Sequence, residues 1–361
     1  MVYWRKLFDQ EIDPLYSIKL SDGINYTDTK ILSIKRTEST WKEVYNLKLD
    51  SRVDFVPGDS IGLLCPNNIK LADQIFNLLG IPNDFYYIKQ IGRSGFEYKG
   101  SLRDFFIHIF DFTSLPKKSF LYDISKKSPY RSQIEYLCSK EGTADYLSMI
   151  KRWNNVIDFI LTFECKISLE DLLMNCQTVK PRYYSLTNSI KDKCSILVGT
   201  ISKEINGIIR YGHVSDFVHN GHTKDLKICL RVSNLIRIGN SLKILCICTG
   251  TGVAPFLSFM KNKKEDQKLK IIYGFRNVED DLTHNEKLST NTEIIKVLSS
   301  TKMYVTDYID KNQKYIEEFV REDCLVYVCG RSEMQKRIFE IFSERYNYLV
   351  EDKRLFFDSW L

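Results

Sequence analysis

The sequence has few residues of the kinds that build metal centres, and it lacks a membrane-spanning run. Its ten cysteines include no CxxC pair, and its five histidines include one close pair, His219 and His222. A structural zinc site needs several close thiolates or imidazoles, so we expect no metal. No apolar run approaches the roughly 20 residues of a transmembrane helix, and the N-terminus has no signal-peptide core. We therefore expect a cytoplasmic protein with reduced thiols and no membrane association.

An excess of one charge is also missing. The 52 Lys and Arg residues against 46 Asp and Glu residues give a net charge of +6, without the clustered basic patch that nucleic-acid binding requires. Aromatic residues, in contrast, make up 13% of the 361-residue chain. They suit a protein that packs flat ring systems, and they serve equally well as ordinary core. The length allows two or three domains.

The chain alternates between strand-like and helix-like stretches. Period-two alternation predicts strands at 16–19, 30–34 and 44–49. A further strand is expected at 61–66, after the turn at 57–59, and strands return at 181–187, 194–202 and 226–233. Between these two groups the apolar spacing is helical, with Gly80 as a C-cap. We therefore expect an antiparallel β-barrel formed by residues 1–66 and 178–238, interrupted by a helical connecting insertion at 67–177.

The last third of the chain has a different period. Apolar strands are predicted at 243–248, 270–275, 302–305 and 324–330, with helices near 284–290, 311–320 and 331–346. Continuous apolar strands that alternate with helices indicate a doubly wound parallel sheet. Residues 239–361 are therefore expected to form an α/β domain.

The run ProArgTyrTyrSerLeuThrAsnSer at 181–189 carries the strongest chemical signal. In an extended strand Arg182 and Tyr184 share one face and Ser185 lies on the other. A guanidinium can hold a pyrophosphate, a phenol ring offers a stacking surface, and a hydroxyl can reach a ring nitrogen. These groups suit a flavin dinucleotide. Taken alone, the run fits equally a strand with an exposed Arg and a core Tyr.

Two glycine turns could bind phosphates. TyrGlyHisValSer at 211–215 combines a small residue with a hydroxyl. GlyThrGlyValAlaPro at 250–255 follows a buried strand and opens a helix, where backbone N–H groups and the helix dipole bind pyrophosphate. Pro255 stands where the usual dinucleotide motif has its third glycine, and proline is well tolerated in a first helical turn.

Together these motifs resemble the ferredoxin-reductase superfamily. ArgTyrTyrSer is similar to its flavin strand, GlyHisValSer to its pyrophosphate turn and GlyThrGlyValAlaProPhe to its nicotinamide loop. TyrGlyPheArg at 273–276 and TyrValCysGly at 327–330 are similar to two further strand ends, and AspSerTrpLeu at 358–361 narrows the resemblance to diflavin reductases. The resemblance implies an FAD-binding barrel, an NADP-binding α/β domain and hydride transfer from NADPH to FAD.

The resemblance also implies a set of site residues. Ser185, Cys329, Asp358 and Trp360 would surround the meeting point of nicotinamide and flavin, with Trp360 covering the flavin face. The residues expected to bind FAD are Arg182, Tyr183, Tyr184, Ser185, Gly212, His213, Val214, Ser215 and Trp360, and those expected to bind NADPH are Gly250, Thr251, Gly252, Pro255, Arg276, Ser299, Lys302 and Tyr304. Without the resemblance, Cys329 would be interpreted as core.

Three departures from the family pattern concern cofactor binding. The loop at 329–334 is one residue shorter than in the family and lacks its acid, and Thr200 stands where relatives often have an aromatic residue beside the adenine. The arginine usually next to the phosphate-binding serine is missing, and Arg276 is expected to compensate.

The resemblance implies that electrons pass from FAD to an FMN-containing, flavodoxin-like module. Nothing before residue 14 could form one, so we expect either a fragment or an FMN module on another chain. Segments 58–67, 115–121 and 137–146 look most like the methionine synthase reductase branch, which makes methionine synthase the expected acceptor. The alternatives are a diflavin reductase for iron–sulfur assembly or a haem enzyme, and a reductase-derived scaffold without turnover.

Overall fold

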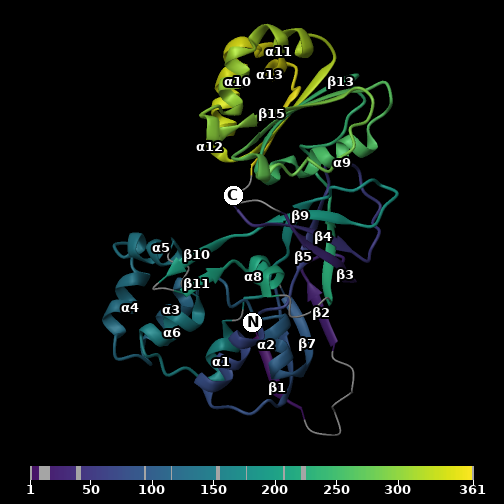
Figure 1. Cartoon of the computed structure of the whole chain (residues 1–361). Coiled ribbons are helices and arrows are strands. Elements are labelled where there is room, and N and C mark those ends of the chain that lie inside the picture. The colour runs from purple at the N-terminus through teal and green to yellow at the C-terminus, as the bar shows by residue number, and fades with distance from the viewer. Residues whose placement is uncertain are drawn as a thin grey trace. The chain divides into compact units, whose positions relative to one another are not determined.

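The computed structural model describes residues 2–7, 17–37, 42–92, 95–114, 116–151, 155–175, 177–205, 208–220 and 225–359. The chain forms two compact units, each assembled from separate stretches (Figure 1). The first, which we call the helical unit, takes in residues 1–26, 64–181 and 201–223. The second, which we call the two-sheet unit, takes in residues 27–63, 182–200 and 224–361.

The helical unit contains an antiparallel sheet in the order β1-β6-β7-β2. Its strands are β1 (Val2–Lys6), β2 (Ser17–Ser21), β6 (Phe85–Gln90) and β7 (Gly95–Ser101). The hairpin of β6 and β7 lies inside the stretch for which the sequence indicated helices alone, so that expectation is wrong for residues 85–101. The strand expected at 16–19 pairs with β7 and does not join the antiparallel sheet of the other unit.

Helices make up most of the rest of this unit. They are α1 (Ile69–Leu79), α2 (Leu102–His108), α3 (Lys118–Ser125), α4 (Arg131–Cys138), α5 (Thr143–Lys151), α6 (Val156–Thr162), α7 (Leu169–Met174) and α8 (His213–Asn220). Helix α8 follows a hairpin of two strands, β10 (Ser202–Ile205) and β11 (Ile208–Tyr211). Local chemistry sets their ends. Gly80 closes α1 in the left-handed conformation at φ 60°, as the sequence predicted, and Asn155 with Asp158 forms a capping box on α6.

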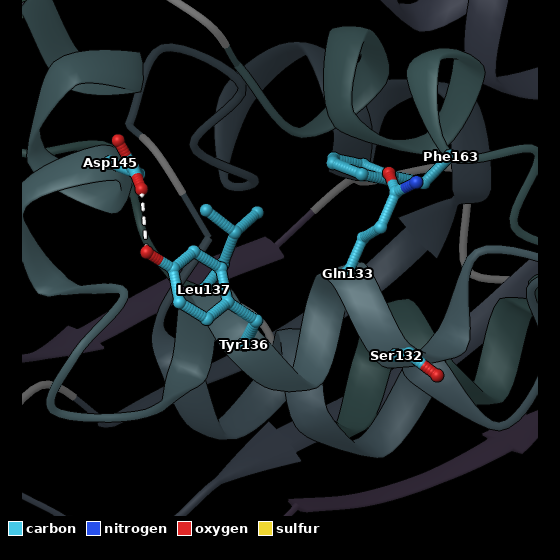
Figure 2. Close-up of a pocket in the computed structure, with 6 residues that line it drawn as sticks. All are labelled: Ser132, Gln133, Tyr136, Leu137, Asp145 and Phe163. Carbon is cyan, nitrogen blue, oxygen red and sulfur yellow. Dashed lines mark hydrogen bonds between the residues drawn. The ribbon is translucent and has the colours of Figure 1, made fainter.

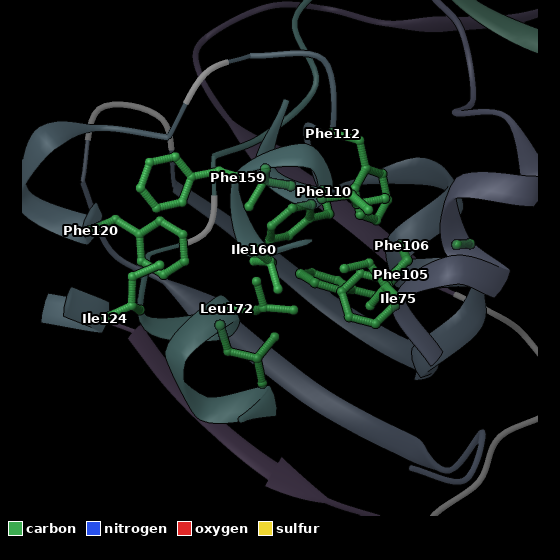
Figure 3. Close-up of a cluster of buried hydrophobic side chains, with 14 of the residues drawn as sticks. Ile75, Phe105, Phe106, Phe110, Phe112, Phe120, Ile124, Phe159, Ile160 and Leu172 are labelled. Atoms are coloured by element: carbon green, nitrogen blue, oxygen red, sulfur yellow. The ribbon is translucent and has the colours of Figure 1, made fainter. Parts of the chain in front are cut away.

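The core of the helical unit is rich in phenylalanine. Phe105, Phe106, Phe110 and Phe112 gather in one cluster with Phe159, which comes from a later helix (Figure 3). The ring centroids of Phe110 and Phe112 lie 4.9 Å apart and those of Phe105 and Phe106 5.6 Å apart, within the range of favourable aromatic pairs. Much of the aromatic content is therefore core.

The two-sheet unit begins with an antiparallel sheet. In the described residues its order is β8 (Arg182–Ser185), β5 (Ser60–Leu64), β12 (Asp225–Arg231), β3 (Thr27–Arg36), β4 (Val44–Leu49) and β9 (Ser195–Gly199). The pairs β5–β8, β3–β12, β3–β4 and β4–β9 are antiparallel. This sheet confirms that antiparallel strands from both sides of residues 67–177 come together.

The other sheet of this unit is parallel. Its order is β15 (Thr292–Leu298), β14 (Lys268–Phe275), β13 (Lys243–Thr249), β16 (Cys324–Gly330) and β17 (Leu355–Ser359). One face packs against α9 (Ala254–Asn262), and the other packs against α10 (Val305–Lys311), α11 (Gln313–Val320), α12 (Ser332–Arg345) and α13 (Asn347–Glu351) (Figure 1). The predicted doubly wound sheet is confirmed. Chain order reverses between β13 and β16, where such sheets bind ligands.

One strand of this sheet differs from the prediction. The strand expected at 302–305 lies instead at β15, and residues 299–301 form the 3-10 turn η4 (Ser299–Thr301). Residues 284–290, expected to be helical, contain no helix. β15 is an edge strand whose sequence TEIIKVL mixes charged and apolar residues, so it lacks the continuous apolar run by which central strands are recognised.

Candidate functional site

Strand β8 presents two different faces, as the alternation predicts. Tyr183 and Ser185 line a cleft, and Arg182 and Tyr184 are not among its lining residues. Ser185 is 3% exposed and stands opposite Ser60 of β5, while Arg182 is exposed. The loop after β8 is bonded to α9, since the Ser258 hydroxyl of α9 donates to the Asn188 carbonyl at 2.9 Å. Helix α9 packs on one face of the parallel sheet. The flavin-strand motif therefore lies in the same unit as the glycine loop that precedes α9.

The cleft has a volume of about 370 Å³ and is formed by four stretches of chain. Its lining residues are Ser60, Tyr183, Ser185, Arg231, Val232, Ser233, Asn234, Leu235 and Asp358. Arg231, at the end of β12, places its guanidinium carbon 4.8 Å from the centroid of the Tyr183 ring, which is a cation–π distance. Hydroxyl groups, a cation, a carboxylate and an aromatic ring thus face one space. The sequence reasoning did not find Arg231, because only the fold brings it to Tyr183.

Asp358 enters this cleft from β17, the last strand of the parallel sheet. Burial raises the pKa of its carboxyl, and the positive charge of Arg231 opposes that rise. The structure therefore brings together two of the residues expected at the reacting centre, Ser185 and Asp358, from two different sheets.

Cys329 of β16 is the register neighbour of Asp358 on β17 and of Cys248 on β13. It is fully buried and belongs to the hydrophobic cluster on the α9 face of the sheet. It is not among the residues that line the cleft. Its position beside Asp358 agrees with the expected neighbourhood, and its burial equally fits the interpretation as core.

The glycine loop lies at the carboxyl end of β13, where chain order reverses. Gly250 adopts φ 54° and opens η2 (Gly250–Val253), and Pro255 lies in the first turn of α9. A Cβ on Gly252 would lie 2.5 Å from the Cys329 carbonyl oxygen, so this position excludes a side chain. The loop after β13 and the end of β16 are therefore in direct contact.

Two cations accompany the glycine loop, and the sequence reasoning had not singled them out as ligands. A Cβ placed on Gly199 would lie 3.2 Å from Thr251 Cγ2 and 3.3 Å from Lys42 Nζ, so Lys42 and Thr251 both lie beside Gly199. Burial lowers the pKa of Lys42, and the nearby charge of Arg331 lowers it further. Arg331 is the N-cap of α12. Two positive groups thus flank the N-terminal ends of α9 and α12, where anions bind.

The residues expected around the 2′-phosphate follow the ends of β14 and β15. Ser299 opens η4, Lys302 closes it in the left-handed conformation at φ 60°, and Tyr304 is the N-cap of α10 with 59% of its surface exposed. The backbone carbonyl of Arg276, just after β14, accepts from Ser300 N at 3.1 Å. These residues come together although the strand predicted at 302–305 was wrong.

The motif at 212–215 belongs to the helical unit and opens α8. Ser215 is 5% exposed, and its hydroxyl accepts from Ile201 N at 2.8 Å. The His213 ring lies 2.9 Å from the Cys65 carbonyl, Val214 is buried, and Gly212 N donates to Ile201 O. Trp360 lies outside the described residues.

Comparison with known families decides what this arrangement is. Residues 39–217 match the FAD binding domain, and residues 246–339 match the oxidoreductase NAD-binding domain. The chain carries the FAD-binding and NAD-binding oxidoreductase domains of the ferredoxin–NADP reductase family. The resemblance indicated by the motifs is confirmed. The first match includes β4, β5, β8 and β9 of the antiparallel sheet, and the second includes β14, β15 and β16 of the parallel sheet.

Curated relatives of this chain include the sulfite reductase [NADPH] flavoprotein alpha-component of Buchnera aphidicola (Schizaphis graminum), which is 26% identical over 94% of this chain and 60% of that protein. The methionine synthase reductase of Rattus norvegicus is 24% identical over 88% of this chain and 55% of its own length. The NADPH–cytochrome P450 reductase of Cavia porcellus is 22% identical over 82% and 50%. The chain thus spans 50–60% of the length of these three relatives.

A solved structure supports the fold. A point mutant of ferredoxin-NADP+ reductase from Plasmodium falciparum, crystallised in complex with 2'P-AMP, aligns with a TM-score of 0.52 at 16% identity. The alignment covers 93% of this chain and 96% of that one.

The residues of the chain fit the two dinucleotides that its two matched domains imply. The bare backbone at Gly252, two helix N-termini and the cations Lys42 and Arg331 fit a pyrophosphate. The cleft offers a ring face at Tyr183 and a hydroxyl at Ser185 for a flat heterocycle. Among the described residues no group of three or more side chains is arranged to hold a metal ion.

A second hollow lies in the helical unit. Its lining residues are Ser132, Gln133, Tyr136, Leu137, Asp145 and Phe163 (Figure 2). The Tyr136 hydroxyl donates to Asp145 Oδ2 at 3.0 Å, so this pair is already satisfied. The hollow is mainly apolar and carries no group suited to redox chemistry. No helix in the described part of the chain is long and apolar enough to cross a bilayer.

Proposed function

We propose that this chain transfers a hydride from NADPH to FAD and then delivers electrons to an FMN-containing, flavodoxin-like module. The observation that carries the proposal is the shared cleft, which is lined by Ser185 from the antiparallel sheet and by Asp358 from the parallel sheet. In this family one sheet binds the flavin and the other the nicotinamide nucleotide, so a site of hydride transfer requires both sheets to contribute.

When bound, FAD accepts the hydride and the nicotinamide donates it. The chain's residues hold and orient the two rings. Ser185 offers a hydroxyl hydrogen toward the flavin, Asp358 supplies a carboxylate at the same place, and Tyr183 provides a flat surface braced by Arg231. We also propose that Cys329 lies beside the nicotinamide and that Trp360 covers the flavin face.

The remaining proposed contacts bind the dinucleotides. Arg182, Tyr184 and residues 212–215 bind FAD, and the loop 250–255 binds the NADPH pyrophosphate with Lys42 and Arg331. Ser299, Lys302, Tyr304 and Arg276 bind the 2′-phosphate, which gives a preference for NADPH over NADH. This preference is supported by the exposed Lys302 and the half-buried Ser299 at the end of β15.

For the acceptor we propose methionine synthase, reached through an FMN module. The support is the likeness of segments 58–67, 115–121 and 137–146 to the methionine synthase reductase branch, and the 24% identity to the rat protein. The 26% identity to a sulfite reductase flavoprotein favours a second candidate, an FMN module that serves sulfite reduction. We propose the cytoplasm as the location, in line with the absence of disulfides among the described cysteines.

The first experiment tests hydride transfer. Purified protein reconstituted with FAD should be yellow, and NADPH should bleach the flavin absorbance under anaerobic conditions. Ser185→Ala should slow the bleaching by roughly a hundredfold, on the scale of a lost group at the reacting centre, with flavin content unchanged. A preparation that takes up no FAD would instead indicate a scaffold that lacks catalytic turnover.

The second experiment identifies the acceptor. The protein is mixed with separately purified FMN domains of a methionine synthase reductase and of a sulfite reductase flavoprotein, and NADPH oxidation is followed. NADPH-dependent reactivation of methionine synthase with the first domain is the expected result. Faster electron delivery to the second domain would overturn the acceptor and leave the hydride-transfer proposal intact.

A further inference from the structure

One side chain ties together the ends of the two strands that lead to the cleft. Gln335 of α12 is 7% exposed. Its amide nitrogen donates to the Gly330 carbonyl at 3.0 Å and to the Asp358 carbonyl at 2.5 Å. Gly330 is the last residue of β16, and Asp358 is the penultimate residue of β17. The amide therefore uses both of its hydrogens to connect two strand ends.

The hydrogen bonds of Gln335 lie where the pairing of β16 with β17 ends. The final register pairs of β16 and β17 are Cys329 with Asp358 and Gly330 with Ser359. In the described part of the sheet β17 is an edge strand, and its neighbour is β16. The end of an edge strand opens more readily than its middle, because fewer hydrogen bonds hold it. Gln335 adds a bond at the residue whose side chain lines the cleft.

The choice of glutamine is informative. A buried primary amide is costly unless its polar atoms find partners, and an apolar residue would fill a helix–sheet interface at lower cost. Gln335 faces two backbone carbonyls, which accept hydrogen bonds and cannot donate them. A side chain with two donor hydrogens in a fixed plane satisfies both carbonyls at once.

We propose that Gln335 is a positioning residue for Asp358. By clamping the backbone of β17 to the end of β16, it holds the Asp358 carboxyl in the cleft with Ser185 and Arg231. The role rests on the proposed hydride transfer, because Asp358 acts there. Gln335 itself touches no reacting atom.

The test compares Gln335→Met, which keeps the length and loses both donors, with Arg337→Ala on the same helix. Arg337 is exposed and pairs with the exposed Glu340 at 3.0 Å, so its removal controls for changes to α12. Single-turnover bleaching of bound FAD by NADPH is expected to slow by about tenfold in Gln335→Met, with the affinity for NADPH unchanged. Arg337→Ala should react like wild type.

A second measurement needs no cofactor. Hydrogen–deuterium exchange of the apoprotein should show faster exchange in a peptide spanning 355–359 for Gln335→Met and unchanged exchange for Arg337→Ala. Wild-type exchange at 355–359 together with wild-type bleaching in Gln335→Met would overturn the inference. If wild type and Arg337→Ala are not bleached by NADPH, the proposed function fails, and the exchange result still decides whether the clamp exists.

If Gln335→Met binds no flavin, Gln335→Glu tests whether Gln335 positions Asp358. The introduced carboxyl donates one hydrogen bond when it is protonated, and it repels both carbonyls when it is ionised. The bleaching rate of this variant should therefore fall by about tenfold between roughly pH 5 and pH 8 relative to wild type. Tyr183 and Arg231 line the cleft with Asp358, and Cys329 is the register neighbour of Asp358. All four residues are present in both proteins, so the ratio of the two rates reports the change at position 335. A ratio that does not change with pH would contradict the clamp.

Discussion

At the residue scale, Asp358 is the carboxyl group of the site that is affected both by burial and by a nearby positive charge. Its carboxyl is partly buried, and burial raises its pKa while the Arg231 charge opposes the rise. A carboxylate kept in such surroundings is maintained at a cost in stability, which is common for groups that act in a reaction.

Replacing Asp358 by Asn should stabilise the protein at neutral pH and slow hydride transfer. Because the folded state raises the pKa of Asp358, it favours the protonated acid. The stabilisation of the folded state that results is fully present below the ordinary pKa of about 3.9. It is lost as pH rises through the raised value. The unfolding midpoint of Asp358→Asn should exceed that of wild type by about 2 °C at pH 7, and the two should converge in acid.

Thermal unfolding followed by circular dichroism at several pH values measures this difference. Asp352→Asn is the control, since Asp352 is exposed and pairs with Arg354 at 2.9 Å. A difference between Asp358→Asn and wild type that does not vary with pH would count against the burial argument.

At the scale of elements, the glycine loop and β15 show what could and could not be predicted from the sequence. GlyThrGlyValAlaPro was found because a buried strand, a turn and a helix start follow one another locally. β15 was missed because its edge position leaves it with charged residues among the apolar ones. Lys42 and Arg231 were missed because their contacts are tertiary, and no local pattern marks them.

Two glycines of the same loop should respond differently to alanine. Gly252→Ala places a methyl group 2.5 Å from a backbone carbonyl oxygen that cannot move aside, so it should cost about 3 kcal/mol of unfolding free energy. Gly250 has open space around it and only its left-handed backbone at φ 54° resists a side chain, so Gly250→Ala should cost about 1 kcal/mol. Urea unfolding of both variants gives the comparison, and equal costs would contradict the close contact.

Lys302 can be tested without disturbing its turn. Lys302→Asn removes the charge and keeps a residue that tolerates the left-handed conformation at φ 60°. Binding of NADPH should weaken by roughly 1.5–3 kcal/mol, the value of a hydrogen bond to a charged group, and binding of NADH should not change. Isothermal titration with both nucleotides provides the measurement. Equal losses for the two would remove Lys302 from the phosphate site.

At the scale of the whole molecule, the helical unit is where the sequence misled most. Phe85–Gln90 and Gly95–Ser101 carry mixed aromatic and charged residues within a long helical stretch, and their pairing with β1 and β2 joins residues far apart in the chain. The two-sheet unit was predicted more fully, because its strands are central and its turns carry glycine at required positions.

The fragment 239–361 offers a test at this scale. It contains all five parallel strands, and the core on the α10–α13 face comes entirely from this stretch. The core on the α9 face, however, includes Val44, Leu197 and Ile236. The fragment should fold with a midpoint lower by about 10 °C, since several kcal/mol of burial are lost. It should also bind NADPH several-fold more weakly than the full chain, because Lys42 is absent. Calorimetry measures both.

The division of the chain into interleaved stretches bears on its synthesis. The helical unit needs residues 201–223 in addition to 1–26 and 64–181, so a nascent chain cannot complete that unit until its third contribution has left the ribosome. By then the antiparallel sheet of the other unit still waits for β12. Exposed apolar surface should therefore persist until β12 has left the ribosome, and the chain is expected to depend on chaperones that bind emerging polypeptides.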